Sequence, residues 1–131
     1  MTTVTDLVAQ RQTGVSSLTP TEFAAEADDP RTVVIDLREA DERTSTGSIA
    51  GAIHVPRGLL EFRVDSSNRH HVSGLDPDAR ILLYCDDGAR SVLAAVTLHG
   101  LGYHSVAVLG GGLDAWDAAR LPLVGRSHPP Y

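Results

Sequence analysis

Residues 81–91 read ILLYCDDGARS, an apolar run that ends at a cysteine and continues into a short loop containing one glycine. The apolar run at residues 81–84 is typical of a strand buried on both faces of a sheet. Residues 89–99 carry apolar side chains at helical spacing and precede two glycines, which predicts a helix. The stretch therefore predicts a strand, a loop that begins at Cys85, and a helix.

Similar patterns extend to both sides of this stretch. A capping box at Thr19 and Glu22, with proline at the first helical position, predicts the start of a helix. Because strands alternate with helices, we expect an α/β fold with a mainly parallel sheet. The predicted strands cover residues 33–37, 53–55, 81–84 and 106–109, and the predicted helices cover residues 1–13, 20–27, 58–64, 89–99 and 113–119.

Length and charge exclude several classes of function. The 131 residues suit one domain, and we expect neither a membrane span nor a signal peptide, which favours a cytoplasmic protein. The net charge is −6 and all 11 basic residues are arginine, so a nucleic-acid-binding face is not expected. The absence of lysine excludes Schiff-base catalysis and a Walker-type phosphate loop.

Cys85 is the only cysteine, which excludes an intrachain disulfide and a metal site with several cysteines. We interpret His70 and His71 as part of a solvated turn, because adjacent loop residues rarely bind one ion together. We therefore expect no metal and no cofactor.

Cys85 stands where ligands bind in parallel sheets, just beyond the carboxyl end of a strand. Backbone N–H groups in the following loop and the helix N-terminus would form an anion-binding nest that favours the thiolate. Gly88 permits the tight turn and Arg90 adds a positive charge. The alternative is that Cys85 is an unreactive buried residue at a strand end.

Four motifs stand out along the chain: Asp36-Leu37-Arg38, residues 47–56 (GSIAGAIHVP), residues 84–91 (YCDDGARS), and residues 111–116 (GGLDAW) followed by Leu121-Pro122. Together and in this order they resemble the single-domain rhodanese family of sulfurtransferases. The resemblance covers residues 15–124. Residues 1–14 form an N-terminal helical extension and residues 125–131 a C-terminal tail outside it.

The resemblance implies a three-layer fold with a central, mainly parallel five-stranded sheet flanked by helices. It implies that Cys85 accepts sulfane sulfur as a persulfide. The active-site loop comprises Asp86, Asp87, Gly88, Ala89, Arg90 and Ser91. Related phosphatases and arsenate reductases have one residue more between cysteine and arginine than residues 85–90, so sulfur transfer is favoured over these two rival activities.

Asp36 and Arg38 are predicted to support this loop. We expect an ion pair between Asp36 and Arg90 that fixes the loop; the alternative is that Arg90 contacts the sulfur donor. Asp86 and Asp87 stand where the family commonly has neutral or basic residues, and their charge disfavours thiosulfate.

A single cysteine cannot resolve its own persulfide, so the acceptor must be an external thiol, cyanide or a partner protein. The expected donor is thiosulfate or a low-molecular-weight persulfide. The alternative from another class is a non-enzymatic module that carries sulfur or binds a partner. The sequence predicts no particular oligomeric state.

Overall fold

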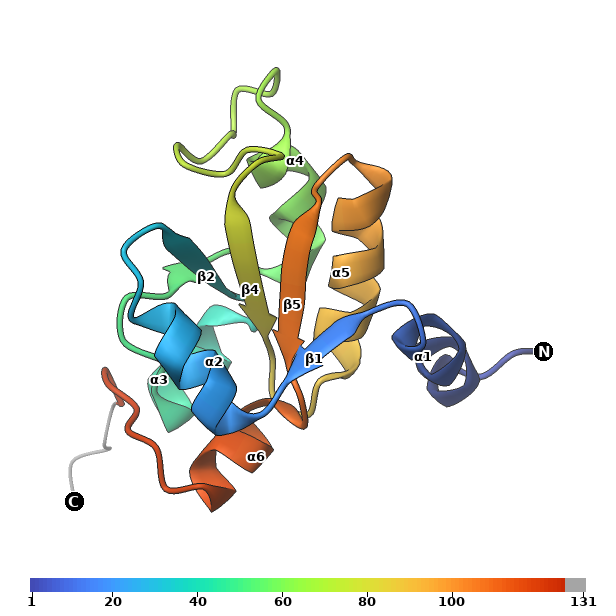
Figure 1. The fold of residues 1–131 in the computed structure, drawn as a ribbon. Coiled ribbons are helices and arrows are strands. Elements are labelled where there is room, and N and C mark those ends of the chain that lie inside the picture. The colour runs from blue at the N-terminus through green and yellow to red at the C-terminus, as the bar shows by residue number, and fades with distance from the viewer. Residues whose placement is uncertain (127–131) are drawn as a thin grey trace.

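The computed structural model describes residues 1–126, and its centre is a sheet of five parallel strands (Figure 1). The strands are β1 (Ser16–Leu18), β2 (Thr32–Asp36), β3 (Ile53–His54), β4 (Arg80–Tyr84) and β5 (Ser105–Leu109). Their order across the sheet is β1-β5-β4-β2-β3. Because β4 is the middle strand, neighbouring strands flank the residue that follows it, Cys85.

Helices cover both faces of the sheet and complete a three-layer arrangement (Figure 1). They are α1 (Val4–Gln12), α2 (Pro20–Ala27), α3 (Ala40–Thr46), the 3-10 helix η1 (Arg57–Leu59), α4 (Leu60–Val64), α5 (Ala89–Gly100) and α6 (Gly112–Ala118). Within residues 1–126, no helix combines the length and the apolar character needed to cross a membrane.

Successive side chains along each strand point to opposite faces of the sheet, so the molecule has one hydrophobic core on each face. Val34 and Leu82 are register partners that pack with α2 and α6 on one face. Ile35 and Leu83, the next pair, pack with α4 and α5 on the other face. The strands are therefore buried on both sides, as their continuous apolar runs predict.

The predicted start of α2 is confirmed in detail. Thr19 Oγ1 accepts a hydrogen bond of 3.2 Å from the Glu22 N–H, and Glu22 Oε1 accepts one of 2.8 Å from the Thr19 N–H. Pro20 occupies the first helical position. This capping fixes the helix that carries Phe23 into the core, where its ring packs against the buried Trp116.

The predicted α/β fold is confirmed, but β1 and α3 escape prediction from residue patterns. Strand β1 is a three-residue edge strand with two exposed serines, so it shows no apolar run. Helix α3 reads ADERTST and buries no side chain, so it has no apolar periodicity. Both elements depend on tertiary contacts instead of local apolar pattern.

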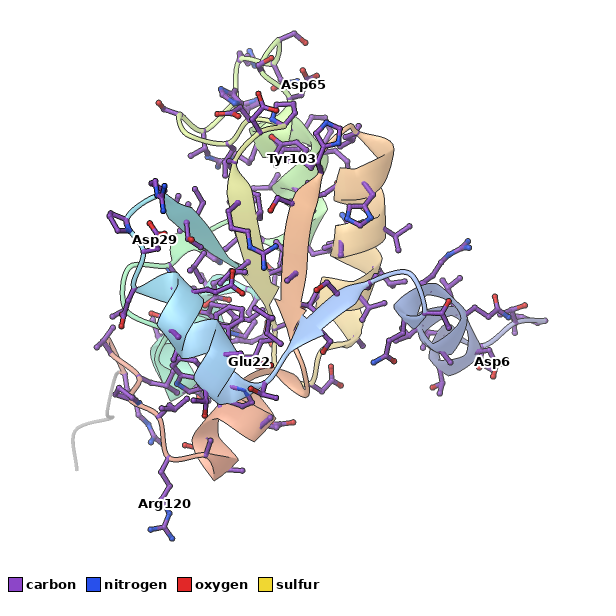
Figure 2. The ribbon with its side chains drawn as sticks, in the orientation of Figure 1. Asp6, Glu22, Asp29, Asp65, Tyr103 and Arg120 are labelled. Atoms are coloured by element: carbon purple, nitrogen blue, oxygen red, sulfur yellow. The ribbon has the colours of Figure 1, made fainter. Side chains whose placement is uncertain are left out.

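The carboxyl ends of β4 and β5 point toward α6 (Figure 1). Tyr103 and Asp65 lie at the opposite end of the molecule (Figure 2). Residues beyond α6 return to the rest of the chain, where Ser48 and Val124 exchange two backbone hydrogen bonds of 2.8 Å. The end of the molecule that holds Cys85 is therefore enclosed by segments distant in sequence.

Candidate active site

The Cys85 thiol lies where β4 ends and the loop into α5 begins. Its side chain is buried, and the Gly88 N–H donates a hydrogen bond of 3.2 Å to Cys85 Sγ. Gly88 adopts a φ of 100°, a left-handed conformation that favours glycine, directly before the first turn of α5. The sulfur therefore lies beside a helix N-terminus, where backbone dipoles favour negative charge.

The start of α6 holds this loop in place. The Leu113 N–H donates a hydrogen bond of 2.9 Å to the Cys85 carbonyl, and the Asp114 N–H donates one of 2.9 Å to the Asp86 carbonyl. Both carbonyls are thereby fixed by backbone groups of another element. The loop geometry depends on the position of α6.

Close approach of α6 requires glycine. Gly111 and Gly112 have φ values of 75° and 62°, in the left-handed region that favours glycine. A Cβ atom on Gly112 would collide with the Asp86 carbonyl and lie 2.7 Å from the Asp87 nitrogen. Gly112 therefore allows backbone of α6 to pack directly against the loop.

The two loop carboxylates have different surroundings. Asp87 is exposed, and its Oδ1 accepts a hydrogen bond of 3.0 Å from the Ala89 N–H at the start of α5. Asp86 lies between two arginines, with Oδ1 3.6 Å from Arg38 Nη1 and Oδ2 3.4 Å from Arg90 Nη2. Asp87 therefore caps the start of α5, whereas Asp86 belongs to a cluster of ion pairs with Arg38 and Arg90.

Glu42 of α3 forms the main ion pair of Arg90. The two guanidinium nitrogens lie 2.9 and 2.8 Å from the two oxygens of Glu42, a forked arrangement. The hydrogen bonds from Arg90 are the main reason that the pKa of Glu42 is lowered to about 2. The same hydrogen bonds raise the pKa of Arg90. Burial, together with Glu42, raises the pKa of Asp86.

The predicted ion pair between Asp36 and Arg90 is wrong. Asp36 is buried, and both of its carboxylate oxygens accept hydrogen bonds from Arg38. Arg38 Nε lies 3.1 Å from Oδ1 and Arg38 Nη2 lies 2.9 Å from Oδ2. Arg43 Nε and the Tyr84 hydroxyl donate to Asp36 Oδ2 at 3.1 and 2.7 Å. Because these donors occupy the carboxylate, Arg90 pairs with α3 instead.

The pair of Asp36 and Arg38 forms a buried charged support under the loop. Burial raises the pKa of Asp36, but hydrogen bonds from Arg38 and Tyr84 outweigh it and hold the pKa below its ordinary value. Burial and Asp36 raise the pKa of Tyr84. Arg38 also donates to the Gly47 carbonyl at 2.6 Å and to Thr46 Oγ1 at 2.6 Å. This buried pair contacts the loop where Arg38 lies 3.6 Å from Asp86.

Ser91 completes the predicted loop. It lies in the first turn of α5, is fully buried, and its Oγ has no hydrogen-bond partner among residues 1–126. The segment from Cys85 to Ser91 is continuous, and the structure places it at one edge of the sheet with Arg38.

The charges around Cys85 nearly balance. The cluster contains three arginines and four carboxylates, a net charge of −1: Arg38, Arg43 and Arg90, with Asp36, Glu42, Asp86 and Asp87. Every arginine in it is paired with a carboxylate. The positive charge of each of these three arginines is therefore compensated.

A groove of about 590 Å³ borders the loop. Its walls combine acidic residues with a small apolar floor. It is lined by Asp86 and Asp87 of the loop, Leu113, Asp114 and Asp117 of α6, and Thr46, Leu121, Leu123 and Arg126. A molecule that approaches the loop from this side meets mainly negative charge.

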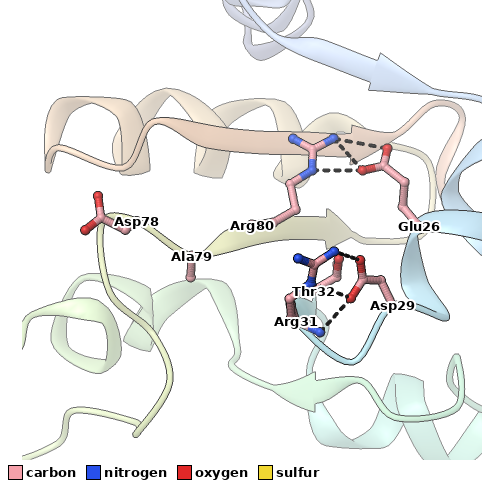
Figure 3. Close-up of a pocket in the computed structure, with 7 residues that line it drawn as sticks. All are labelled: Glu26, Asp29, Arg31, Thr32, Asp78, Ala79 and Arg80. Atoms are coloured by element: carbon pink, nitrogen blue, oxygen red, sulfur yellow. Dashed lines mark hydrogen bonds and ion pairs between the residues drawn. The ribbon is translucent and has the colours of Figure 1, made fainter.

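A second hollow, of about 390 Å³, lies at the amino ends of β2 and β4 (Figure 3). Both of its arginines are paired: Arg31 with Asp29 at 3.0 Å, and Arg80 with Glu26 at 2.9 Å. It lies at the opposite end of the strands from Cys85.

No group of three or more histidine, cysteine or acidic residues in residues 1–126 could hold a metal ion. His70 is exposed, and a ring nitrogen of His71 lies 2.7 Å from the Leu75 carbonyl. The two histidines are therefore engaged in local contacts of their loop.

Glu42, Arg43 and Tyr84 belong to the site, but sequence patterns did not single them out. A signal existed for Glu42: it stands at the third position of α3, and its Oε2 accepts a hydrogen bond of 2.7 Å from the Glu39 N–H. Such an acidic residue marks a helix start. No local sequence pattern indicates that Glu42 pairs with Arg90, which is 48 residues away.

A family model described as a rhodanese-like domain matches residues 19–119. The chain belongs to the rhodanese family. A sulfurtransferase of Allochromatium vinosum is 33% identical over 98 residues, which cover 75% of this rhodanese and 83% of that protein. A putative sulfurtransferase of Bacillus subtilis is 31% identical over 94 residues, covering 72% and 82% of the two chains. The resemblance inferred from the four motifs is confirmed.

Solved structures agree with the fold of this rhodanese. The polysulfide-sulfur transferase homodimer of Wolinella succinogenes has a TM-score of 0.75 and 28% identity, covering 95% of this chain and 89% of that chain. A Rhodopseudomonas palustris protein of unknown function, described as a possible tyrosine phosphatase, has a TM-score of 0.86 and 28% identity, covering 93% and 94%. The family and the relatives named as sulfurtransferases support sulfurtransferase activity in general.

Proposed function

We propose that this rhodanese transfers sulfane sulfur through a persulfide on Cys85. The Cys85 thiolate attacks the outer sulfur of the donor and forms a new S–S bond. The bond between the two donor sulfurs breaks, and its electron pair leaves with the inner sulfur as a thiolate, or as sulfite when the donor is thiosulfate. The outer sulfur remains on Cys85.

In the second half of the reaction, a nucleophilic acceptor attacks the terminal sulfur of the persulfide. The bond to Cys85 Sγ breaks, and its electron pair returns to Cys85 as the thiolate. Because the chain has no second cysteine, the acceptor must be an external thiol, cyanide or a cysteine of another protein. The cycle needs no metal or cofactor.

One observation carries this proposal: Cys85 Sγ accepts a hydrogen bond from the Gly88 N–H at the N-terminus of α5. Such a position stabilises both an attacking thiolate and the anionic persulfide that follows. Two backbone hydrogen bonds from α6 keep the loop in position while the sulfur changes its partner. Stabilisation by backbone groups does not depend on the identity of other loop side chains.

Intact mass spectrometry tests the proposal after incubation with thiosulfate, with cysteamine persulfide and with polysulfide. We expect a mass gain of one sulfur atom that is absent in Cys85→Ser and is removed by cyanide or by an added thiol. Multiple turnover with an added thiol acceptor separates an enzyme from a passive sulfur carrier.

Two results contradict the proposal. No mass gain with any of these donors favours a module that only binds a partner. Hydrolysis of an aryl phosphate or reduction of arsenate that requires Cys85, without sulfur loading, favours the rival activities of related folds.

A further inference from the structure

Arg90 is the arginine nearest in sequence to Gly88 of the loop, but its positive charge is already paired with carboxylates of the protein. Both of its terminal nitrogens bind Glu42, and Nη2 also lies 3.4 Å from Asp86. A donor anion that needed Arg90 would have to displace a forked carboxylate. The carboxylate has the advantage, because it is attached to the same protein.

Glu42 is itself held in this position from its own helix. Its Oε2 accepts a hydrogen bond of 2.7 Å from the Glu39 N–H, which fixes the first turn of α3. The pKa of Glu42 is lowered to about 2, so the side chain is ionised at neutral pH. Glu42 therefore presents a permanent negative charge that needs no rearrangement to meet Arg90.

The two other arginines near the loop are also paired with a carboxylate. Arg38 and Arg43 are both bound to the buried Asp36. The groove beside the loop adds Asp114 and Asp117 of α6, which are exposed and have no ion-pair partner among residues 1–126, against one basic residue, Arg126. A dianion thus meets excess carboxylate on its path to Cys85.

We propose that Glu42 determines the donor class of this rhodanese, by neutralising Arg90 and so selecting persulfides with a neutral or cationic leaving group over dianions such as thiosulfate. This inference rests on the proposed function at Cys85. With a persulfide of an aminothiol, the outer sulfur passes to Cys85 and the aminothiol leaves with the electron pair of the broken S–S bond. With thiosulfate, the leaving group is sulfite, whose negative charge stays close to Glu42 and Asp86.

The test isolates the first half of the reaction. Second-order rate constants for sulfur loading of Cys85 are measured by rapid quench and intact mass, with thiosulfate and with cysteamine persulfide as donors. Glu42→Gln removes the charge but keeps an oxygen that can accept the Glu39 N–H bond. Asp41→Asn is the matched control, because Asp41 lies in the same first turn and forms no ion pair within residues 1–126.

We expect Glu42→Gln to raise the thiosulfate rate constant about tenfold at low ionic strength, with the gain shrinking as salt is added. Cysteamine persulfide should change by less than about twofold, and so should both donors in Asp41→Asn. In the unmodified protein, the thiosulfate rate should rise with salt, because screening weakens repulsion. This last measurement needs no variant and stands even if Glu42→Gln folds poorly.

A thiosulfate rate that is unchanged or lower in folded Glu42→Gln overturns the assignment, as does a thiosulfate rate in the unmodified protein that falls with salt. Equal gains for both donors also overturn it, because they indicate a general change of the loop. These results differ from failure of the proposed function, in which neither donor loads sulfur onto Cys85 in any variant.

Discussion

Gly112 at the start of α6 touches the backbone of Asp86 so closely that no side chain fits between them. This contact ties the end of β5 to the loop that follows β4. The same helix start donates hydrogen bonds to the Cys85 and Asp86 carbonyls. The geometry of the thiol is therefore set partly by an element that supplies no reactive group.

Gly112→Ala should displace the loop, because the new Cβ collides with backbone and not with a flexible side chain. We expect a stability loss of about 1–3 kcal/mol and a fall in the sulfur-loading rate of about tenfold or more. Gly51→Ala is the control: Gly51 has a φ of 82°, but its Cβ would meet nothing within 4 Å. Equal effects of the two substitutions on sulfur loading would show that the contact with Asp86 is unimportant.

Tyr84→Phe should remove two buried hydrogen bonds, one donated to Asp36 and one accepted from the Ile49 N–H at 3.1 Å. The expected stability loss is about 1–3 kcal/mol, measured by denaturant unfolding. Sulfur loading should slow as well, because Asp36 positions Arg38 beside the loop.

Tyr103→Phe provides the comparison for this change. The Tyr103 hydroxyl donates a buried hydrogen bond of 2.8 Å to the Val64 carbonyl, at the end of the molecule opposite α6. It should lower stability without altering the loading rate of the folded protein. A loss of rate in both variants would mean that the rate reports general destabilisation.

Arg90 and Glu42 should be coupled in a double-mutant cycle of the two alanine substitutions. The side chains are 35% and 26% exposed, so screening limits the expected coupling to about 0.5–1 kcal/mol of unfolding free energy. A cycle of Arg90→Ala with Asp36→Asn should be additive, because these side chains do not pair. Strong coupling in that second cycle would restore the ion pair predicted from the sequence.

Stability should depend on pH partly through Glu42. Its pKa in the folded protein is about 2, below the ordinary value of 4.5, so its contribution is fully present above pH 4.5 and is lost as pH falls toward 2. Glu42→Gln should therefore lower Tm at about pH 6 and show a shallower decline between about pH 5 and pH 3. Parallel Tm curves for the two proteins would contradict this link.

Local patterns predict the elements whose own residues carry the signal. The Thr19 capping box predicts α2, and continuous apolar runs predict β2, β4 and β5 within one residue at each end. Cys85 follows β4, so its place at the carboxyl edge of the sheet follows from topology alone. The position of the candidate nucleophile, Cys85, was therefore accessible from the sequence.

Pairing between distant charged residues is not encoded in such patterns. Asp36 could reach several arginines, and nothing local shows that Arg38 folds back onto it while Arg90 crosses to Glu42. Helix α3, which brings Glu42 there, has no apolar face to reveal it. The loop could thus be located from the sequence, but the ion pairs that its charged residues form could be identified only from the folded structure.

Because Ser48 and Val124 are bridged, a force on the carboxyl end of the chain reaches the Cys85 loop by a different route from a force on the amino end. A pull applied beyond Val124 acts on Ser48 and on the neighbouring Gly47, whose carbonyl holds the buried Arg38 guanidinium. A pull at the amino end acts on α1, which buries no side chain and meets the loop only across a hollow that it shares with Asp87, Gly88 and Ala89. Immobilisation on a surface or fusion to another protein through the amino end should therefore disturb the thiol loop less than attachment through the carboxyl end.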